Sequence, residues 1–165
     1  MSTSTNTSRR SALALMGGGA ASLALAACGR SAEAKSFPVS RSEAEWRERL
    51  TSEEFRILRK AGTERAFSSP LHDSKRSGTY VCAGCANPIY SSQHKYDSGT
   101  GWPAFWQPLK RSAVGTSTDT KIGYPRTEVH CARCGGHLGH IFNDGPQPTG
   151  KRHCINGVAM DFRPA

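Results

Sequence analysis

The chain has 165 residues, of which 36% are hydrophobic, 17 are Gly and 9 are Pro. One domain is the expected organisation, because domains usually hold roughly 100–200 residues. The apolar content excludes a disordered chain, and the absence of a three-residue Gly and Pro period excludes collagen. Beyond the first 30 residues, no segment is long and apolar enough to cross a bilayer.

Residues 1–27 carry the features of an export signal. Arg9 and Arg10 form a basic start, an uncharged run rich in Ala, Leu and Gly follows, and small residues precede Cys28. The paired arginines favour the twin-arginine (Tat) route. The ending Leu25–Cys28 resembles a bacterial lipobox, which implies a lipoprotein anchored through Cys28 on the periplasmic side of the cell envelope. The alternative is an uncleaved signal anchor, for which three consecutive glycines are poorly suited.

Residues 28–40 are expected to form a flexible tether, because they mix Ser, Ala and Lys with little apolar content. Loss of Arg9 and Arg10 with the signal lowers the formal net charge of the chain from +9 to +7. On an exported protein, this charge indicates a solvated surface or attraction to anionic lipid headgroups. We therefore expect no nucleic-acid partner.

Two capping-box patterns predict two short helices at the start of the globular domain. Ser42-x-x-Glu45 and Thr51-x-x-Glu54 each place a hydroxyl and a carboxylate where they satisfy the free amides of a helix start. Apolar residues follow both patterns at helical spacing, and Gly62 is expected to end the second helix. Both helices are interpreted as packing elements.

After the helices, short apolar runs alternate with clusters of Gly, Pro, Ser, Asn and Asp, which is typical of β-strands. The domain, placed at residues 41–165, is therefore expected to be mainly β and mostly antiparallel. The expected strands are 80–82, 87–90, 121–124, 128–130 and 155–162. Longer strands should be interrupted by Gly135, Gly136, Gly139, Gly145 and Pro146.

Four of the six cysteines form two C-x-x-C pairs, Cys82 with Cys85 and Cys131 with Cys134. Two residues between the sulfurs let one tight turn present both thiolates, and Zn²⁺ prefers four such ligands in a tetrahedron. A metal bound here would join two distant segments and would be structural. Two disulfides, which export favours, or a thioredoxin-like redox pair are the alternatives, although no βαβ pattern surrounds either pair.

Cys154 stands apart from these pairs, directly after Lys151, Arg152 and His153. Positive neighbours lower the pKa of a thiol and so favour the reactive thiolate. On a strand, Asn156 would project from the same face as Cys154 and place an amide beside the sulfur. A buried structural cysteine explains this local sequence equally well.

Two further patterns are candidates for a site. His137 and His140 lie in a Gly-rich segment that we interpret as a turn, and they either act as acid–base or oxygen-binding groups or have no role. Trp102, Phe105 and Trp106 either belong to the core or line a pocket for an apolar, sulfur-bearing group.

Five segments together form a recognisable set: Tyr80–Cys85, Ser98–Phe105, Arg126–Val129, Cys131–Phe142 and Arg152–Asn156. They resemble the motifs of the B-type methionine sulfoxide reductase family, the peptide-methionine (R)-S-oxide reductases. The resemblance extends from about Ser42 to Phe162. It implies two antiparallel sheets with two or three short N-terminal helices and a Cys₄ zinc site. It also implies thiol-dependent repair of oxidised proteins, as part of the response to oxidative stress.

The resemblance also implies roles for single residues. Cys154 would be the nucleophile, passing through a sulfenic acid, while Asn156, His137 and His140 would hold or protonate the sulfoxide oxygen. Trp102 would face the substrate methyl group, and the two cysteine pairs would hold one structural Zn²⁺. The implied partners are proteins bearing methionine-R-sulfoxide and a thioredoxin-like reductant, and the chain is expected to act as a monomer.

Two positions depart from the family pattern. Thr100 stands where many members have a cysteine that closes a disulfide with the nucleophile, and His153 stands where many have Tyr. Without a resolving cysteine, we expect an outside thiol to reduce the sulfenic acid. The rival functions are a non-catalytic zinc module that binds through its basic surface and a thiol–disulfide oxidoreductase that uses its C-x-x-C pairs.

Overall fold

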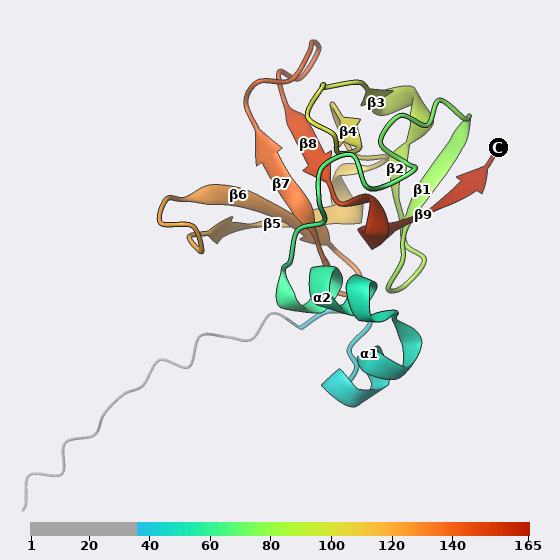
Figure 1. Cartoon of the computed structure of the whole chain (residues 1–165), viewed down its shortest axis with the longest axis vertical. Helices are drawn as coiled ribbons and strands as arrows, with labels where there is room; N and C mark the ends of the chain where they lie inside the picture. The colour runs from blue at the N-terminus through green and yellow to red at the C-terminus, as the bar shows by residue number, and fades with distance from the viewer. Residues whose placement is uncertain (1–35) are drawn as a thin grey trace, which may run out of the picture. The chain divides into compact units, whose positions relative to one another are not determined.

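The computed structural model describes residues 36–165, so the predicted signal and Cys28 lie outside the described residues (Figure 1). Two antiparallel sheets, of three and six strands, accompany two α-helices at the N-terminal side. The expected mainly β architecture with two sheets is therefore confirmed. Within residues 36–165, no helix has the length and apolar character needed to span a membrane.

The helices α1 (Glu43–Arg49) and α2 (Ser52–Lys60) begin as the capping boxes predict. The Thr51 hydroxyl accepts the amide N–H of Glu54, and the Glu54 carboxylate accepts the N–H of Thr51 at 2.7 Å. Ser42 and Glu45 form the same reciprocal pair. The buried side chains of α2 are Phe55, Ile57 and Leu58. The role of the helices as packing elements is confirmed.

The C-terminal end of α2 differs from the prediction by one residue. Ala61, not Gly62, adopts the left-handed conformation, with φ of 49°. Gly62 donates its N–H to the carbonyl of Arg56 at 3.0 Å. A Cβ at position 62 would lie 2.9 Å from that carbonyl oxygen, so close approach of the backbone explains this glycine.

The small sheet has the order β2-β1-β9 and the large sheet the order β3-β4-β8-β7-β6-β5. The small sheet contains β1 (Gly78–Cys82), β2 (Pro88–Ser91) and β9 (Met160–Pro164). The large sheet contains β3 (Lys95–Tyr96), β4 (Ala104–Phe105), β5 (Val114–Asp119), β6 (Arg126–Cys131), β7 (His137–Phe142) and β8 (Arg152–Ile155). Three short 3₁₀ helices lie at Ser92–His94, Arg111–Ala113 and Gly157–Ala159.

Aromatic side chains join the two sheets in the core. Phe105 of the large sheet stacks on Tyr90 of β2, with ring centroids 4.4 Å apart, and meets Tyr80 of β1 edge-on at 5.0 Å. All three residues are fully buried. Burial of several such rings supplies a large share of the apolar area that holds the sheets together.

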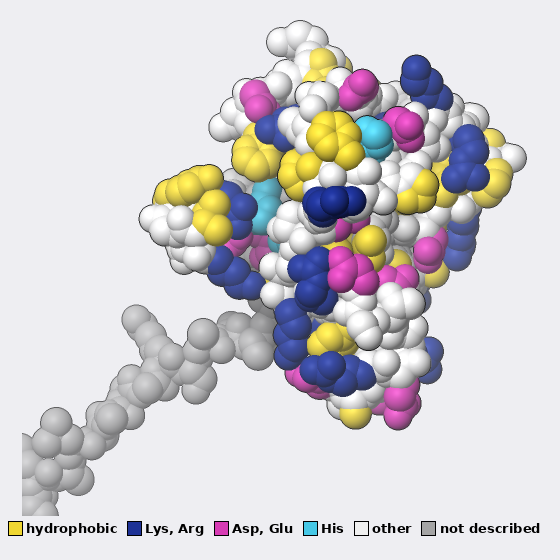
Figure 2. All heavy atoms as spheres, viewed as in Figure 1, with side chains coloured by type: hydrophobic (Ala, Val, Ile, Leu, Met, Phe, Trp, Pro, Cys, Tyr) yellow, Lys and Arg dark blue, Asp and Glu magenta, His cyan; other side chains and the backbone are white. Residues whose placement is uncertain are grey.

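The expected strands at 80–82, 87–90 and 128–130 fall within or largely within β1, β2 and β6. The expected strand at 121–124 is wrong, because these residues form the turn between β5 and β6. Gly123 has φ of 88°, and the Asp119 carboxylate accepts the N–H of Lys121 at 2.9 Å. Figure 2 shows hydrophobic side chains at the tip of this hairpin, where Ile122 and Tyr124 are exposed.

The expected strand at 155–162 is also wrong in its middle. The chain leaves β8 at Ile155 and enters β9 only at Met160. Between them, the buried Glu64 carboxylate accepts the N–H groups of Gly157 and Val158, at 2.6 and 2.9 Å. Because these two N–H groups bind Glu64, they cannot pair with a neighbouring strand. The segment 155–162 is therefore divided between β8 and β9.

Residues 137–140 form the first part of β7 and are not the expected turn. Gly139 does not interrupt the strand. A Cβ at this position would collide with the carbonyl oxygen of Cys154 on β8, so glycine allows close pairing of these two strands. The strands β3, β4 and β5 were not predicted from the sequence.

Contacts with the domain begin a few residues before Arg41. The N–H of Val39 donates to the carbonyl of Arg133 at 2.8 Å, and the Phe37 ring meets His130 edge-on with centroids 5.7 Å apart. Part of the segment expected to be a tether therefore packs on the folded domain.

Candidate active site and cysteine cluster

The sulfurs of Cys82, Cys85, Cys131 and Cys134 all lie within 4.8 Å of one another. The pair Cys82 and Cys134 is separated by 3.7 Å and the pair Cys85 and Cys131 by 3.6 Å. A disulfide would need about 2.05 Å. Four sulfurs about 2.3 Å from a central Zn²⁺ form a tetrahedron with edges of about 3.8 Å. The four cysteines are thus positioned to bind a metal ion.

The cluster connects the two sheets, because Cys82 ends β1 and Cys131 ends β6. Each pair turns tightly, and a residue in the left-handed conformation follows each one: Ala86 with φ of 57° and Gly135 with φ of 68°. Asn87 donates its side-chain amide to the Cys131 sulfur at 3.5 Å. A hydrogen bond of this kind orients a metal ligand from outside the coordination shell.

A second feature is a cavity of about 130 Å³ that opens at Cys154. Its lining residues are Thr63, Trp102, Arg126, Gly139, His140, Phe142, Cys154 and Asn156. Four of the five residues predicted to be catalytic therefore meet at one cavity. Strand pairing brings two of them together, since Cys154 on β8 is directly opposite His140 on β7.

The Cys154 thiol lies in a partly buried environment, and this burial raises its pKa. The nearby Arg152 charge acts in the opposite direction, as does the Thr100 hydroxyl, whose oxygen lies 4.0 Å from the sulfur. Arg152 itself is held by two hydrogen bonds to the Asp144 carboxylate. The Cys154 thiol thus lies at the cavity and near a cation, Arg152, that favours the thiolate.

Glu64 connects two of the predicted residues, although the sequence did not indicate it. Its backbone N–H donates to the side-chain oxygen of Asn156 at 2.9 Å, and its carbonyl accepts from the Trp102 indole at 3.2 Å. The Asn156 amide also donates to the carbonyl of Leu138 at 3.0 Å. One residue from the α2–β1 connection therefore helps to orient both Trp102 and Asn156.

His137 is buried but is not among the residues that line the cavity. Its Nδ1 lies 2.6 Å from a carboxylate oxygen of Glu128 on β6. This hydrogen bond holds the pKa of Glu128 at about 2, although burial opposes it. The rings of His137 and His140 are in edge contact, with centroids 5.3 Å apart.

His140 borders the cavity and pairs with a carboxylate that the sequence did not indicate. Its Nε2 lies 2.7 Å from Oδ2 of Asp119, and the same oxygen accepts from Arg126 at 2.6 Å. Arg126 is the first residue of one of the five motif segments, so its motif was a reason to expect it near the site. Asp119 and Glu64 lie outside all five segments, and no local pattern pointed to either.

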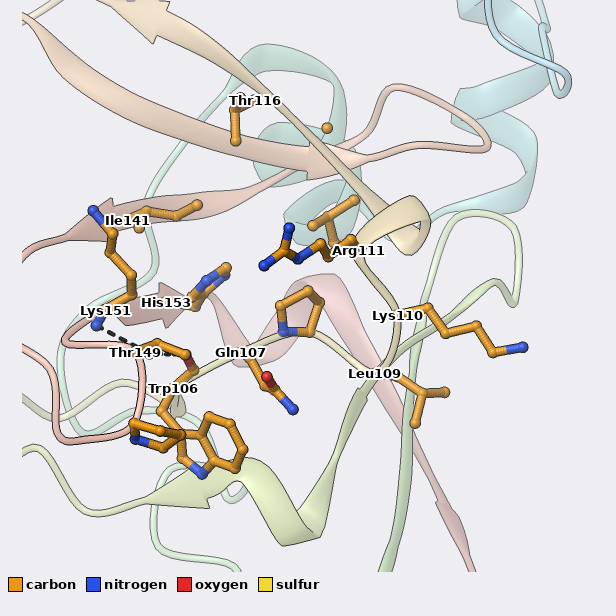
Figure 3. Close-up of a pocket in the computed structure, with 14 residues that line it drawn as sticks. Trp106, Gln107, Leu109, Lys110, Arg111, Thr116, Ile141, Thr149, Lys151 and His153 are labelled. Carbon is orange, nitrogen blue, oxygen red and sulfur yellow. Dashed lines mark hydrogen bonds between the residues drawn. The ribbon is translucent and has the colours of Figure 1, made fainter.

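A larger cavity, of about 810 Å³, lies elsewhere and does not include Cys154. Figure 3 shows its labelled side chains, among them His153 and Arg111, which point toward one another. Neighbouring side chains on a strand project to opposite faces. His153 therefore lines this cavity while Cys154 lines the smaller one.

Comparison with known protein families matches residues 50–164 to the SelR domain. A protein named peptide methionine sulfoxide reductase MsrB from Leptospira interrogans is 50% identical over 127 residues, which cover 77% of this chain and 97% of that protein. The chain belongs to the MsrB family. An MsrB from Agrobacterium fabrum is 52% identical over 126 residues, covering 76% of this chain and 93% of that protein.

A third relative, the MsrB from Saccharophagus degradans, is 53% identical over 118 residues, covering 72% of this chain and 88% of that protein. The SelR match includes β1 to β9 and both cysteine pairs. The cavity at Cys154 and the cysteine cluster therefore both lie within the matched part of the chain.

Proposed function

We propose that this chain reduces methionine-R-sulfoxide in oxidised proteins to methionine, with Cys154 as its nucleophile. The activity follows from membership of the MsrB family. The observation that carries the site assignment is the cavity that Cys154 lines together with His140, its partner on the neighbouring strand, and Trp102. A thiolate, an acid–base group and an aromatic wall are what a sulfoxide with a methyl substituent requires.

The chemistry balances within one turnover. The Cys154 thiolate attacks the sulfoxide sulfur while a proton reaches the oxygen, which gives a sulfur–sulfur bond and a hydroxyl on the substrate sulfur. Transfer of that hydroxyl to the Cys154 sulfur breaks the sulfur–oxygen bond of the substrate and the sulfur–sulfur bond, and methionine leaves. The substrate sulfur gains two electrons, and Cys154 loses two to become a sulfenic acid. His140 is the proposed proton donor, because it lines the cavity and His137 does not. The edge contact of the His137 ring is proposed to support the His140 ring.

Trp102 and Asn156 have positioning and binding roles in this proposal. The Trp102 ring packs against the methyl group, since thioether and methyl groups pack well on aromatic rings. Asn156 has two amide hydrogens, and one of them serves the Leu138 carbonyl. The other hydrogen is proposed to contact the sulfoxide oxygen.

We propose that the four-cysteine cluster holds one Zn²⁺. The sulfur separations support a tetrahedral ion, and four thiolates leave no open position for substrate. The metal therefore stabilises the junction of the two sheets and takes no part in the reduction. The thiolates of this cluster are then unavailable for reducing the Cys154 sulfenic acid.

Regeneration is proposed to require an outside dithiol, such as a thioredoxin-like protein. One thiol attacks the sulfenic acid and releases water, and the second thiol displaces Cys154 from the mixed disulfide. We propose that the chain carries out this cycle as a monomer.

We further propose that the protein acts in the bacterial cell envelope as a Tat-exported lipoprotein. The support is the sequence of residues 1–28, with its paired arginines, apolar run and lipobox-like ending. Membrane fractionation of cells expressing the wild type and Cys28→Ala tests this proposal. Release of the variant from the membrane is expected, and an intact mass with no lipid on Cys28 would contradict it.

The enzymatic proposal is tested with a peptide that carries both sulfoxide epimers, in the presence of dithiothreitol. Only the R epimer should be consumed, and Cys154→Ser should abolish its loss while preserving the fold and the bound metal. His140→Asn and Asn156→Ala should slow the reaction by roughly two to four orders of magnitude. Turnover of the R epimer by Cys154→Ser would refute the nucleophile assignment.

A further inference from the structure

The connection between Asp119 and His140 crosses the large sheet. Asp119 ends β5 and His140 lies on β7, and β6 separates the two strands. Their side chains meet at 2.7 Å, and they are 13% and 10% exposed. The β5–β6 hairpin therefore brings a carboxylate to a residue of the Cys154 cavity from a distant part of the sheet.

The Asp119 carboxylate is held on both of its oxygens. The N–H of Lys121 donates to Oδ1 at 2.9 Å, and Arg126 donates to Oδ2 at 2.6 Å. The Lys121 amide, followed by the hydrogen bond from His140, keeps the pKa of Asp119 well below its usual range. The group is thus a carboxylate at neutral pH and can only accept hydrogen bonds.

This ionisation state determines where the hydrogen of a neutral His140 ring must lie. Because Asp119 only accepts, Nε2 of His140 carries the hydrogen, and Nδ1 is left to gain or release a proton. We propose that Asp119, held by Arg126, is a positioning residue that fixes the tautomer of His140 and favours its protonated form during sulfoxide reduction. This inference rests on the proposed role of His140 as proton donor.

The charges around His140 support an active role for Asp119. Burial lowers the pKa of His140, and the Arg126 and His137 side chains act in the same direction. The Asp119 carboxylate opposes them. Cys154, the partner of His140 on β8, lines the same cavity. Of the charged or titratable side chains that act on His140 within residues 36–165, Asp119 is the one that stabilises the imidazolium.

Glu128 and His137 form a second carboxylate–imidazole pair, next to that of Asp119 and His140. Its 2.6 Å hydrogen bond is as short as that of Asp119 and His140, but His137 does not line the cavity. Glu128→Gln therefore disturbs a similar pair beside the site. If Asp119 acts through His140, Glu128→Gln should slow the reaction less than Asp119→Asn does.

The direct test is ¹⁵N NMR of the His140 imidazole in the full chain. The wild type should show the hydrogen on Nε2. In Asp119→Asn, the Lys121 amide and Arg126 compete for the single amide oxygen, so its NH₂ group turns toward His140. We expect a shift toward the Nδ1–H tautomer and a lower His140 pKa. An unchanged tautomer and pKa would overturn the proposal. Arg126→Gln should shift the tautomer less, and it should not reproduce the fall in the His140 pKa, because it removes a charge that lowers that pKa.

Kinetics then separate this inference from the proposed function. Asp119→Asn should lower kcat/KM for the R epimer by roughly 10- to 100-fold, as loss of an orienting partner does. In a His140→Asn background the same change should have little further effect, because both act through one ring. Asp161→Asn, on β9, is the matched control and should be unchanged. The proposal would be refuted if the Asp119→Asn/His140→Asn variant lost kcat/KM by the product of the two single losses. Full activity of His140→Asn would instead refute the proton-donor role.

Discussion

The hydroxyl oxygen of Thr100 lies 4.0 Å from the sulfur of Cys154 and 2.8 Å from the hydroxyl of Ser98. The resemblance to the family implies that many members have a resolving cysteine at the position of Thr100. Positions 100 and 154 therefore lie close together in this chain, although position 100 carries a hydroxyl and no sulfur. A hydroxyl cannot form a disulfide, so the oxidised state of Cys154 should persist until an outside thiol arrives.

Thr100→Cys should convert the enzyme to a two-cysteine cycle. After exposure to excess substrate without reductant, the wild type should gain the mass of one oxygen and react with a sulfenic-acid reagent at Cys154. The variant should instead form a disulfide between Cys154 and the introduced thiol, because the two side chains already approach within contact distance. Mass spectrometry under non-reducing conditions distinguishes these products.

Thr116→Cys is a control for this experiment, because Thr116 is exposed and lines the other cavity. It should keep the sulfenic acid. A disulfide in the wild type between Cys154 and a cysteine of the cluster, with loss of metal, would contradict the one-cysteine cycle.

Cys85→Ser should remove the bound metal and broaden the unfolding transition. The cluster joins β1 to β6, and binding free energy of a structural metal is also folding free energy. Metal analysis and thermal unfolding of the purified chain measure both effects. Cys154→Ser, outside the cluster, should keep one zinc per chain and the wild-type transition. Absence of zinc from the wild type, with the four sulfurs in disulfides, would contradict the metal assignment.

Lowering the pH should destabilise the fold through His153. Burial, and then the Lys151 charge, lower the pKa of His153 from 6.5 to about 4, and the Tyr90 hydroxyl lies 3.0 Å from its Nδ1. Because the folded pKa is the lower one, the stability contribution is complete above pH 6.5 and is lost as the pH falls through 4. The loss between pH 7 and 4 should be on the order of 3 kcal/mol.

His153→Gln isolates this contribution. Gln does not titrate, yet it retains an acceptor for the Tyr90 hydroxyl. Urea unfolding at several pH values should therefore show a weaker dependence between pH 7 and 4 in the variant than in the wild type. Equal pH dependence of the two proteins would show that His153 is not the group responsible.

Glu64→Gln should reduce both stability and catalysis. The change weakens two hydrogen bonds from Gly157 and Val158 to a buried carboxylate, at a cost of about 1–3 kcal/mol. The backbone of Glu64 also orients Trp102 and Asn156, so kcat/KM should fall even where the variant is fully folded. Urea unfolding and the peptide assay measure the two effects. Glu53→Gln, on the exposed surface of α2, is the control.

Sequence patterns predicted those features whose physical cause is local. A capping box is complete within four residues, so Ser42 and Thr51 marked both helix starts correctly. The spacing of each cysteine pair likewise depends on one tight turn. The nucleophile candidate and three further lining residues were predicted because the family motifs preserve their order along the chain.

Only the tertiary structure decided which groups support those residues. Glu64 reaches Asn156 across 92 positions, and Asp119 reaches His140 across 21, because strand pairing and the path of the α2–β1 connection bring them together. The same long-range contacts divide the segment 155–162 and extend 137–140 into a strand. A sequence pattern records which side chains are available locally. Their hydrogen-bond partners depend on strand order and register, which the packing of the whole chain determines.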